Sequence, residues 1–258
     1  MQQKDEWEKA ADAYSVPHVR KAHIRMPAFM RALGDVTGKN ILDVGCGDGY
    51  YARLMAHQGA RVTGVDFSET FINTAQKEEL RSPLGITYLQ GDIADVLPLE
   101  DKSFDAMVAD MVFVTIPTQE AYGRSISEMA RLLRVGGFIL ISKEHPANFD
   151  RQGSLTKQAS PNYVVTHKEH LSYFDSLAPQ HVKLKIEGKD VEWTNYHRTL
   201  EDFVNPWTTR GFAVTEIIEP KPTAEAVEQF PQDLESTAHI PYYLILKLTK
   251  TADVSNKE

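Results

Sequence analysis

Residues 40–51 of this chain read Asn-Ile-Leu-Asp-Val-Gly-Cys-Gly-Asp-Gly-Tyr-Tyr, and they indicate the architecture more clearly than any other segment. Apolar residues directly before glycines are typical of a buried parallel strand. Gly45, Gly47 and Gly49 then allow a sharp turn and a close approach of the main chain to a ligand, because glycine has no Cβ. A helical pattern starts at about Tyr50, and the N–H groups of its first turn would be directed at that ligand. The segment therefore predicts a nucleotide-type pocket at the end of a strand.

The spacing of the glycines distinguishes two kinds of nucleotide pocket. A dinucleotide fingerprint has the pattern Gly-x-Gly-x-x-Gly/Ala, in which the last small residue lets the helix pack closely. Here the bulky Tyr50 takes that last position, and the third glycine, Gly49, comes one residue early. With Asp43 two residues before Gly45, the segment instead resembles motif I of the class I S-adenosylmethionine-dependent methyltransferases. An NAD-dependent oxidoreductase stays open as the weaker alternative.

An acid at the end of the next predicted strand extends the pattern. Residues 61–68 predict a second strand that carries Asp66 at its end, where a carboxylate could accept hydrogen bonds from both ribose hydroxyls. The same acid would suit NAD, so it indicates a ribose and not a particular cofactor. Ser68 is then expected to cap a helix that runs to about Leu80.

Three further strands carry features that resemble the same family. Residues 86–93 predict a third strand that ends in Gly-Asp-Ile; the resemblance implies that Asp92 takes the adenine amino group and that Ile93 packs on the ring. The ending Leu-Leu-Arg-x-Gly-Gly before an apolar strand is another feature of these methyltransferases. The remaining predictions are a fourth strand over 103–110, a helix over about 119–133 that is closed by the glycines of 134–137, and a fifth strand over 138–142.

The resemblance implies an α/β fold with a Rossmann-like sheet of seven mostly parallel strands and helices on both faces. The strand order would be 3-2-1-4-5-7-6, with strand seven antiparallel, an N-terminal helical cover and a small β-rich insert. Strands six and seven are expected over 212–218 and 242–248, joined by a linker over 220–241. We expect a single domain over 1–258 with four segments: a cover over 1–36, a cofactor-binding core over 37–146, a substrate-side insert over 147–198 and C-terminal core elements over 199–250.

Composition agrees with one globular enzyme domain. The chain has 258 residues, of which 42% are hydrophobic and 25% are charged, values that are ordinary for globular proteins. It shows neither an apolar run of membrane-spanning length nor a signal peptide, so we expect a cytoplasmic protein without membrane contact. The formal net charge of −8 argues against a nucleic-acid substrate. The one cysteine excludes an internal disulfide and a cysteine-based zinc site.

The resemblance also implies a set of residues around S-adenosyl-L-methionine. Tyr14 belongs to a Trp-x-x-x-Ala-x-x-Tyr pattern that resembles the cover helices of relatives, and a packed core position is its alternative. Cys46 is better interpreted as a small buried residue that fills space in the loop than as a nucleophile. No metal is expected, because a catechol-type site would have Asp-Asn after strand five, where this chain has Lys143-Glu144. The expected cofactor-binding residues are Tyr14, Asp43, Gly45, Cys46, Gly47, Asp66, Phe67, Asp92, Ile93, Asp110 and Met111.

Two histidines are candidates for the catalytic side of the site. His145 follows strand five, at the sheet edge where open α/β sheets bind ligands, and could act as a base or orienting group. A histidine that only holds its loop is the alternative. His197 precedes a helix that is expected to be capped by Thr199, and it could line the pocket or stabilise that cap. In the insert, short strands are expected over 172–175, 181–187 and 191–197, the last two as a hairpin, with a roof of aromatic side chains over the substrate.

Two classes of function remain in view beside the oxidoreductase. The first is an enzyme that transfers the methyl group of S-adenosylmethionine to an O, N, S or C nucleophile of a small-molecule metabolite and releases S-adenosyl-L-homocysteine. The chain resembles the bacterial small-molecule type of these methyltransferases, and we expect a monomer or a homodimer. The second is a noncatalytic module that binds S-adenosylmethionine without turnover. The sequence identifies neither the acceptor nor the atom that is methylated.

Overall fold

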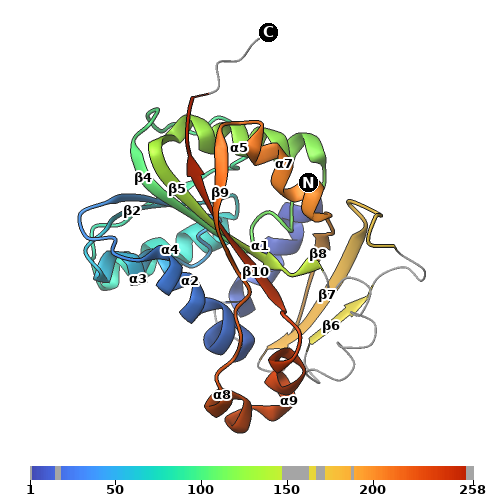
Figure 1. Ribbon diagram of the computed structural model, residues 1–258. Helices are drawn as coiled ribbons and strands as arrows, with labels where there is room; N and C mark the ends of the chain where they lie inside the picture. Colours follow the sequence, from blue (N-terminus) through green and yellow to red (C-terminus); the bar gives the residue numbers. More distant parts are fainter. Residues whose placement is uncertain (1, 15–18, 147–162, 167–171, 187–188, 254–258) are drawn as a thin grey trace.

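A seven-stranded sheet forms the centre of the molecule (Figure 1). The structure is a computed structural model that describes residues 2–14, 19–146, 163–166, 172–186 and 189–253. The strands of the sheet are β1 (Asn40–Val44), β2 (Arg61–Asp66), β3 (Thr87–Gln90), β4 (Phe104–Asp110), β5 (Leu133–Glu144), β9 (Phe212–Ile218) and β10 (Tyr243–Lys250). Their order is β3-β2-β1-β4-β5-β10-β9, and within this sheet only β10 runs antiparallel to its neighbours. The predicted order and the predicted antiparallel last strand are confirmed.

Helices cover both faces of the sheet, as predicted (Figure 1). The principal ones are α2 (Met26–Leu33), α3 (Tyr50–His57) and α4 (Glu69–Arg81) on one face, and α5 (Gln119–Leu132) and α7 (Leu200–Thr208) on the other. The two predicted caps are present: the Ser68 hydroxyl accepts the N–H of Phe71, and the Thr199 hydroxyl accepts the N–H of Asp202. Between α7 and α5, the indole N–H of Trp207 donates to the hydroxyl of Tyr122 at 2.7 Å, so that both buried polar groups are satisfied.

A second, smaller sheet comes from the insert. It contains β6 (Tyr163–Thr166), β7 (Pro179–Ile186) and β8 (Lys189–Tyr196), all antiparallel, and the β7–β8 pair confirms the predicted hairpin. The strand predicted over 172–175 is wrong. There the N–H of Ser172 donates to the Asp175 carboxylate at 2.7 Å and the N–H of Phe174 donates to the Ser172 hydroxyl at 3.2 Å. These local side-chain hydrogen bonds hold a turn in place of a strand ladder.

The N-terminal helix α1 (Gln2–Tyr14) ties the small sheet to the core. The Glu6 carboxylate accepts the N–H of Thr194 in β8 at 2.9 Å, and the Glu8 carboxylate accepts the N–H of Glu69, at the start of α4, at 2.7 Å. Trp7 lies between the two sides, with its ring 5.4 Å from that of Trp193. The predicted N-terminal cover thus has a physical attachment at each side. A π-helical turn, η1 (Lys21–Arg25), leads from this region into α2. No helix in the described ranges combines the length and the apolar composition that a bilayer crossing needs.

Two segments differ from their predictions. Residues 134–137 do not close α5 but belong to β5, whose pairing with β4 shifts register between Phe104 and Ala106; Gly136, at φ +82°, lies in this irregular part. The linker expected over 220–241 contains α8 (Ala224–Gln229), α9 (Pro231–Leu234) and η3 (Glu235–Ala238). Thr223 caps α8 and Pro231 starts α9, so the prediction overlooked two start signals. Buried Leu234 packs in the same cluster as Ile24 and Tyr243.

Candidate functional site

The glycine loop turns sharply where β1 ends. Gly45, Gly47 and Gly49 all have positive φ, at +63°, +55° and +85°. The N–H groups of Gly45 and Cys46 both donate to the Val65 carbonyl of β2, at 2.7 and 3.1 Å, so the loop crosses towards the end of the neighbouring strand. A Cβ on Gly45 would lie 2.5 Å from Cγ2 of Val112. At Gly45 the loop thus lies so close to the segment that follows β4 that a side chain there would clash with Val112.

Asp66 is held at the end of β2 by main-chain groups. One carboxylate oxygen accepts the N–H of Gly47 at 3.0 Å, and the other accepts the N–H of Ser68 at 2.9 Å. Each oxygen keeps a second lone pair for a ligand. Burial raises the pKa of Asp66 to about 6, against the two N–H groups, which lower it. The side chain is thus oriented for hydrogen bonding and is ionised at neutral pH.

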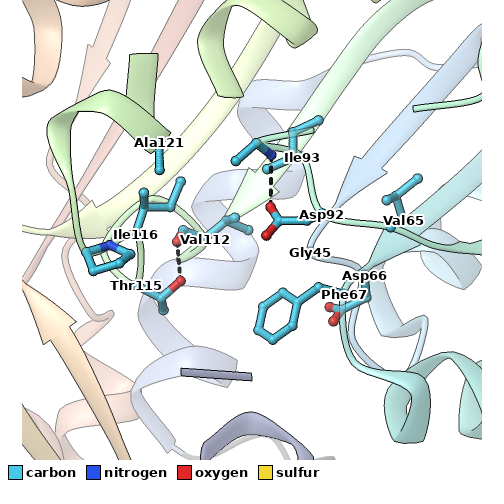
Figure 2. A pocket seen from close by; sticks show the side chains of 13 residues that line it. Gly45, Val65, Asp66, Phe67, Asp92, Ile93, Val112, Thr115, Ile116 and Ala121 are labelled. Carbon is cyan, nitrogen blue, oxygen red and sulfur yellow. Dashed lines mark hydrogen bonds between the residues drawn. The ribbon is translucent and has the colours of Figure 1, made fainter. Parts of the chain in front are cut away.

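A pocket opens beside Asp66, at the carboxyl ends of the parallel strands (Figure 2). Five residues predicted to bind the cofactor line it: Gly45, Asp66, Phe67, Asp92 and Ile93. In Figure 2, Asp66 and Phe67 lie on one side of the hollow, and Thr115 and Ile116, which follow β4, lie on the other. The pocket therefore has an acidic side formed by β2 and β3 and a mainly apolar side formed by the β4 loop.

Asp92 and Ile93 offer the pocket two different surfaces. Asp92 is exposed, and its carboxylate also accepts the N–H of Ala94 at 2.9 Å. Ile93 is 6% exposed and packs into the core cluster on one side while lining the pocket on the other. An acceptor beside a rigid apolar surface suits a flat heterocycle with an exocyclic amine.

Asp43, Cys46, Gly47, Asp110 and Met111 were also predicted to bind the cofactor, but they do not line this pocket. The Cys46 side chain is buried in the core cluster on the α3 face, where burial raises the pKa of its thiol well above the usual value. Asp110 accepts the hydroxyl of Ser142 at 2.6 Å and pairs with Arg25 of η1 at 2.9 Å. Met111, at φ +62°, follows it and packs in the cluster of Ile24. The side chain of Tyr14 lies outside the described residues.

Asp43 is a buried acid with unused hydrogen-bonding capacity. It is 2% exposed, and its Oδ2 atom has no hydrogen-bond partner among the described residues. Burial, together with the nearby Asp110 and Asp66, raises the pKa of this carboxyl well above its usual value. An unsatisfied buried acceptor is costly, so this oxygen suits a donor brought by a ligand.

Several lining residues were absent from the prediction, and most of them follow β4. The prediction for this strand stopped at Asp110 and Met111, although ligands in open α/β sheets bind beyond the carboxyl ends of strands. That rule could have extended it along the next few residues. The lining residues not predicted are Val65, Gly91, Ala94, Val112, Thr115, Ile116, Pro117 and Ala121.

His145 and His197 lie together in a second pocket, which we call the β5 pocket. It is lined by Val114, Lys143, Glu144, His145, Pro146, Gln180, Tyr196 and His197. Neither histidine is among the residues that line the pocket beside Asp66. The structure thus brings the two predicted catalytic residues to each other, and Val114 lies in the same β4 loop that lines the first pocket.

Each of these histidines has a partner that holds it. Nε2 of His145 lies 2.9 Å from the Glu219 carboxylate, and burial lowers the pKa of the imidazole although Glu219 opposes the shift. Nε2 of His197 lies 2.8 Å from the carbonyl oxygen of Tyr173, and burial lowers the pKa of His197 to about 4. Both rings are therefore neutral near pH 7, when a neutral imidazole can accept a proton.

Lys143 and Glu144 add buried charge to the β5 pocket. Lys143 is 5% exposed; its ammonium donates to the Arg198 carbonyl at 3.1 Å and lies 4.4 Å over the ring of Phe203. Burial lowers the pKa of Lys143 to about 7. Both Glu144 oxygens accept the Asn195 side-chain amide, at 3.2 and 3.3 Å. The prediction used these two residues only to argue against a metal site.

The aromatic roof expected from the insert is only partly formed by the described residues. Tyr196 lines the β5 pocket, but Trp193 packs against Trp7 in a small core of its own, and Phe174 is 82% exposed. Trp193 does not belong to the expected roof, because alternate residues of a strand face opposite sides of the sheet. The side that Trp193 faces is covered by α1. No group of three or more His, Cys, Asp or Glu suited to a metal ion occurs within the described ranges.

Comparison with known proteins agrees with this geometry. Residues 42–141 match the family model described as a methyltransferase domain. The chain is 30% identical over 119 residues to a ubiquinone biosynthesis O-methyltransferase of Alkalilimnicola ehrlichii, over 46% of this chain and 47% of that protein. It is 35% identical over 120 residues to a fatty-acid O-methyltransferase of Mycolicibacterium smegmatis, over 45% of this chain and 40% of that protein. The chain thus spans about half the length of these curated relatives.

A solved structure covers more of the chain. The S-adenosylmethionine-dependent methyltransferase of Mesorhizobium loti superposes with a TM-score of 0.66 at 24% identity, over 90% of this chain and 98% of that one. At this identity the likeness shows the fold, while the matched family model covers the strands and loops that form the pocket beside Asp66. The chain therefore has the fold of a solved S-adenosylmethionine-dependent methyltransferase, and its residues 42–141 match the methyltransferase domain family.

Proposed function

We propose that this chain transfers the methyl group of S-adenosyl-L-methionine to a small-molecule acceptor. The observation that carries the proposal is the pocket beside Asp66, in which the glycine loop, Asp92 and Ile93 meet at the carboxyl ends of the strands. We call it the cofactor pocket. S-adenosylmethionine supplies a methyl group that is already activated by a sulfonium, so the main task of the protein is to position the acceptor.

The residues present fit this cofactor. Asp66 would hold the ribose hydroxyls through its second lone pairs, Asp92 would accept the adenine amine, and Ile93 would pack on the ring. Asp43 offers an unsatisfied buried oxygen to a donor such as an ammonium group. The bulky Tyr50 at the start of α3 disfavours the dinucleotide alternative, because a dinucleotide loop has a small residue there.

On the acceptor side, we assign the β5 pocket to the small molecule. Its two neutral histidines and the buried pair Lys143 and Glu144 offer hydrogen-bonding groups to a polar acceptor. The relatives compared above are named as O-methyltransferases, which makes a hydroxyl the first acceptor group to test. For a hydroxyl, His145 would take the proton and Glu219 would orient the imidazole.

Calorimetry followed by an acceptor screen tests this function. We expect the protein to bind S-adenosylhomocysteine and not NAD, and to form S-adenosylhomocysteine from S-adenosylmethionine in the presence of hydroxyl-bearing metabolites. Binding of NAD in preference to S-adenosylhomocysteine would overturn the assignment. Tight binding without turnover across the screen would support the noncatalytic binding module.

The role of His145 has its own test once an acceptor is found. Replacing His145 by alanine removes the proposed base, and we expect turnover of a hydroxyl acceptor to fall ~10²–10⁴-fold, the usual range for general acid–base catalysis. Affinity for S-adenosylhomocysteine should stay close to wild type, because His145 does not line the cofactor pocket. Glu219→Gln should give a smaller loss of the same kind. Wild-type single-turnover rates in His145→Ala would mean that transfer rests on positioning alone.

Cofactor affinity should also depend on pH through Asp66. Its pKa in the folded protein is about 6, above the usual aspartate pKa of 3.8. As pH falls through 6 the carboxyl takes up a proton and loses acceptor capacity, so affinity for S-adenosylhomocysteine should fall by up to about tenfold per pH unit and be flat above about pH 7. The free folded protein is stabilised over the same fall in pH, because it binds this proton more strongly than the unfolded chain does. Calorimetry from pH 5 to 8 measures the profile, and Asp66→Asn should remove it.

A further inference from the structure

Arg198 comes two residues after the end of β8, and its side chain is buried in the core of the molecule. It is 1% exposed, and all three of its guanidinium nitrogens donate hydrogen bonds. Nη1 donates to the Phe113 carbonyl at 3.0 Å, and Nη2 donates to the carbonyls of Ile116 and Thr118 at 2.7 and 3.2 Å. The guanidinium also lies 4.6 Å over the ring of Tyr122. One side chain of the insert region thus holds three main-chain carbonyls of the loop that follows β4.

That loop forms a wall shared by both pockets. Val112, Thr115 and Ile116 line the cofactor pocket, whereas Val114, between them, lines the β5 pocket. The loop has no helix or strand of its own, so its carbonyls need partners from elsewhere. The N–H of Tyr196 supplies one of these partners by donating to the Val114 carbonyl at 2.6 Å. The wall is therefore fastened from the end of β8 at several successive positions.

The guanidinium suits this task better than another cation would. Its planar fork can reach several acceptors in fixed directions, whereas a lysine ammonium is a point charge on a flexible stem. Burial lowers the pKa of Arg198 to about 10, which leaves the side chain charged at neutral pH. Loss of the fork would leave buried carbonyls without donors, and the loop would have to move to find water.

We propose that Arg198 is a positioning residue that fixes the wall formed by residues 112–118 and thereby sets the affinity for the cofactor. The inference rests on the proposed function, because it takes the pocket beside Asp66 to be the cofactor site. By this proposal the insert contributes to the cofactor site indirectly, because Arg198 holds the wall. The described residues of the insert do not line that pocket themselves.

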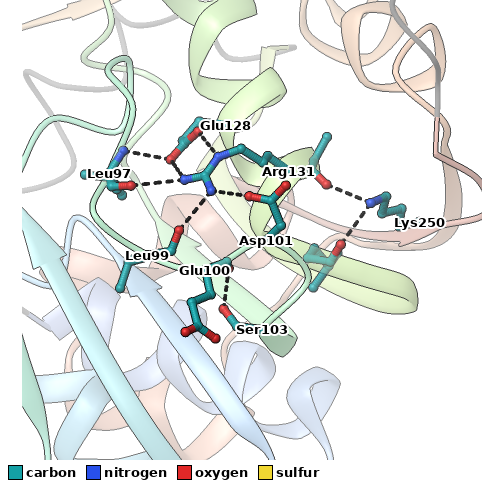
Figure 3. Close-up of polar contacts among 10 residues, drawn as sticks. Leu97, Leu99, Glu100, Asp101, Ser103, Glu128, Arg131 and Lys250 are labelled. Carbon is teal, nitrogen blue, oxygen red and sulfur yellow. Dashed lines mark hydrogen bonds and ion pairs between the residues drawn. The ribbon is translucent and has the colours of Figure 1, made fainter.

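A matched arginine away from both pockets supplies the control (Figure 3). Arg131 donates to the carbonyls of Leu97 and Leu99 at 3.1 and 2.9 Å, and it pairs with Glu128 and Asp101. It holds a loop in the same way, but neither Arg131 nor these partners line the cofactor pocket or the β5 pocket. Its loss should therefore lower stability without a specific effect on ligand binding.

The experiment compares Arg198→Met with Arg131→Met by calorimetry with S-adenosylhomocysteine, at a temperature where circular dichroism shows both variants folded. Both should melt earlier than wild type. Only Arg198→Met should bind more weakly, by about 3- to 30-fold, the scale of coupling through residues that do not touch the ligand. Arg198→Lys, which keeps the charge but loses the fork, should fall between Arg198→Met and wild type.

The outcomes separate this inference from the proposed function. Failure of the wild-type protein to bind S-adenosylhomocysteine would overturn both. Wild-type binding with an unchanged dissociation constant in Arg198→Met, or an equal loss in Arg131→Met, would overturn the positioning role alone. If Arg198→Met does not fold, the dissociation constants of Arg198→Lys and Arg131→Lys for S-adenosylhomocysteine are compared instead. Weaker binding in Arg198→Lys alone would support the positioning role, and equal constants would overturn it.

Discussion

Replacing Gly45 by alanine is expected to weaken binding of S-adenosylhomocysteine by one to two orders of magnitude. The new Cβ would lie 2.5 Å from Cγ2 of Val112, so Val112 must move, and Val112 lines the cofactor pocket. Overpacking of this kind costs about 1–3 kcal/mol. The φ of +63° adds about 1–2 kcal/mol of backbone strain for any residue with a Cβ. Calorimetry gives the dissociation constant, and chemical unfolding gives the loss of stability.

Gly38→Ala is the control that separates strain from the clash. Gly38 has a φ of +72°, close to that of Gly45, but a Cβ there would meet no atom within 4 Å. This variant should lose about 1–2 kcal/mol of stability from strain and bind the cofactor as the wild type does. Equal affinity in the two variants would mean that the Gly45–Val112 contact does not shape the cofactor site.

Asp66→Ala should produce the second large effect, a loss of about 1.5–3 kcal/mol in affinity for S-adenosylhomocysteine, or about 10- to 150-fold. The substitution removes the proposed acceptor of the ribose hydroxyls. It also frees the N–H groups of Gly47 and Ser68, which the carboxylate holds at 3.0 and 2.9 Å. The glycine loop would thus lose a support as well as a ligand contact. Isothermal titration at pH 7.5 measures the change.

Glu79→Ala shows how much of that change is structural. Glu79 is a carboxylate that also accepts main-chain N–H groups, from Leu84, Gly85 and Ile86 at 2.6, 2.7 and 3.2 Å, and it does not line the cofactor pocket. Its loss should destabilise the chain and leave cofactor affinity within about twofold of wild type, as expected for an independent distant site. A dissociation constant that is unchanged in Asp66→Ala would remove Asp66 from the ribose role.

The core of the fold was predictable because its signals are local. The alternation of apolar strands, glycine turns and capped helices repeats over short stretches, so Ser68 and Thr199 could be identified as caps from the residues around them. The sheet order followed from family resemblance, and the structure confirms it. Predictions failed where two local signals compete, as at Ser172–Asp175, where β-prone aromatic residues lie between turn-forming side chains.

In the candidate site, too, residues with a local sequence signal were predictable, and contacts between distant segments were not. Residues at the ends of strands, such as Gly45, Asp66 and Asp92, could be named from sequence because a strand end and its following loop are adjacent in the chain. What the sequence could not indicate are contacts between distant segments: Arg198 on the carbonyl of Phe113, or Glu219 on His145. Such pairs leave no periodic or spacing signal, because their geometry exists only once the insert and the last strands have packed against the sheet. The local sequence therefore indicated which strand-end residues line the pocket, and tertiary packing alone decided what holds those residues in place.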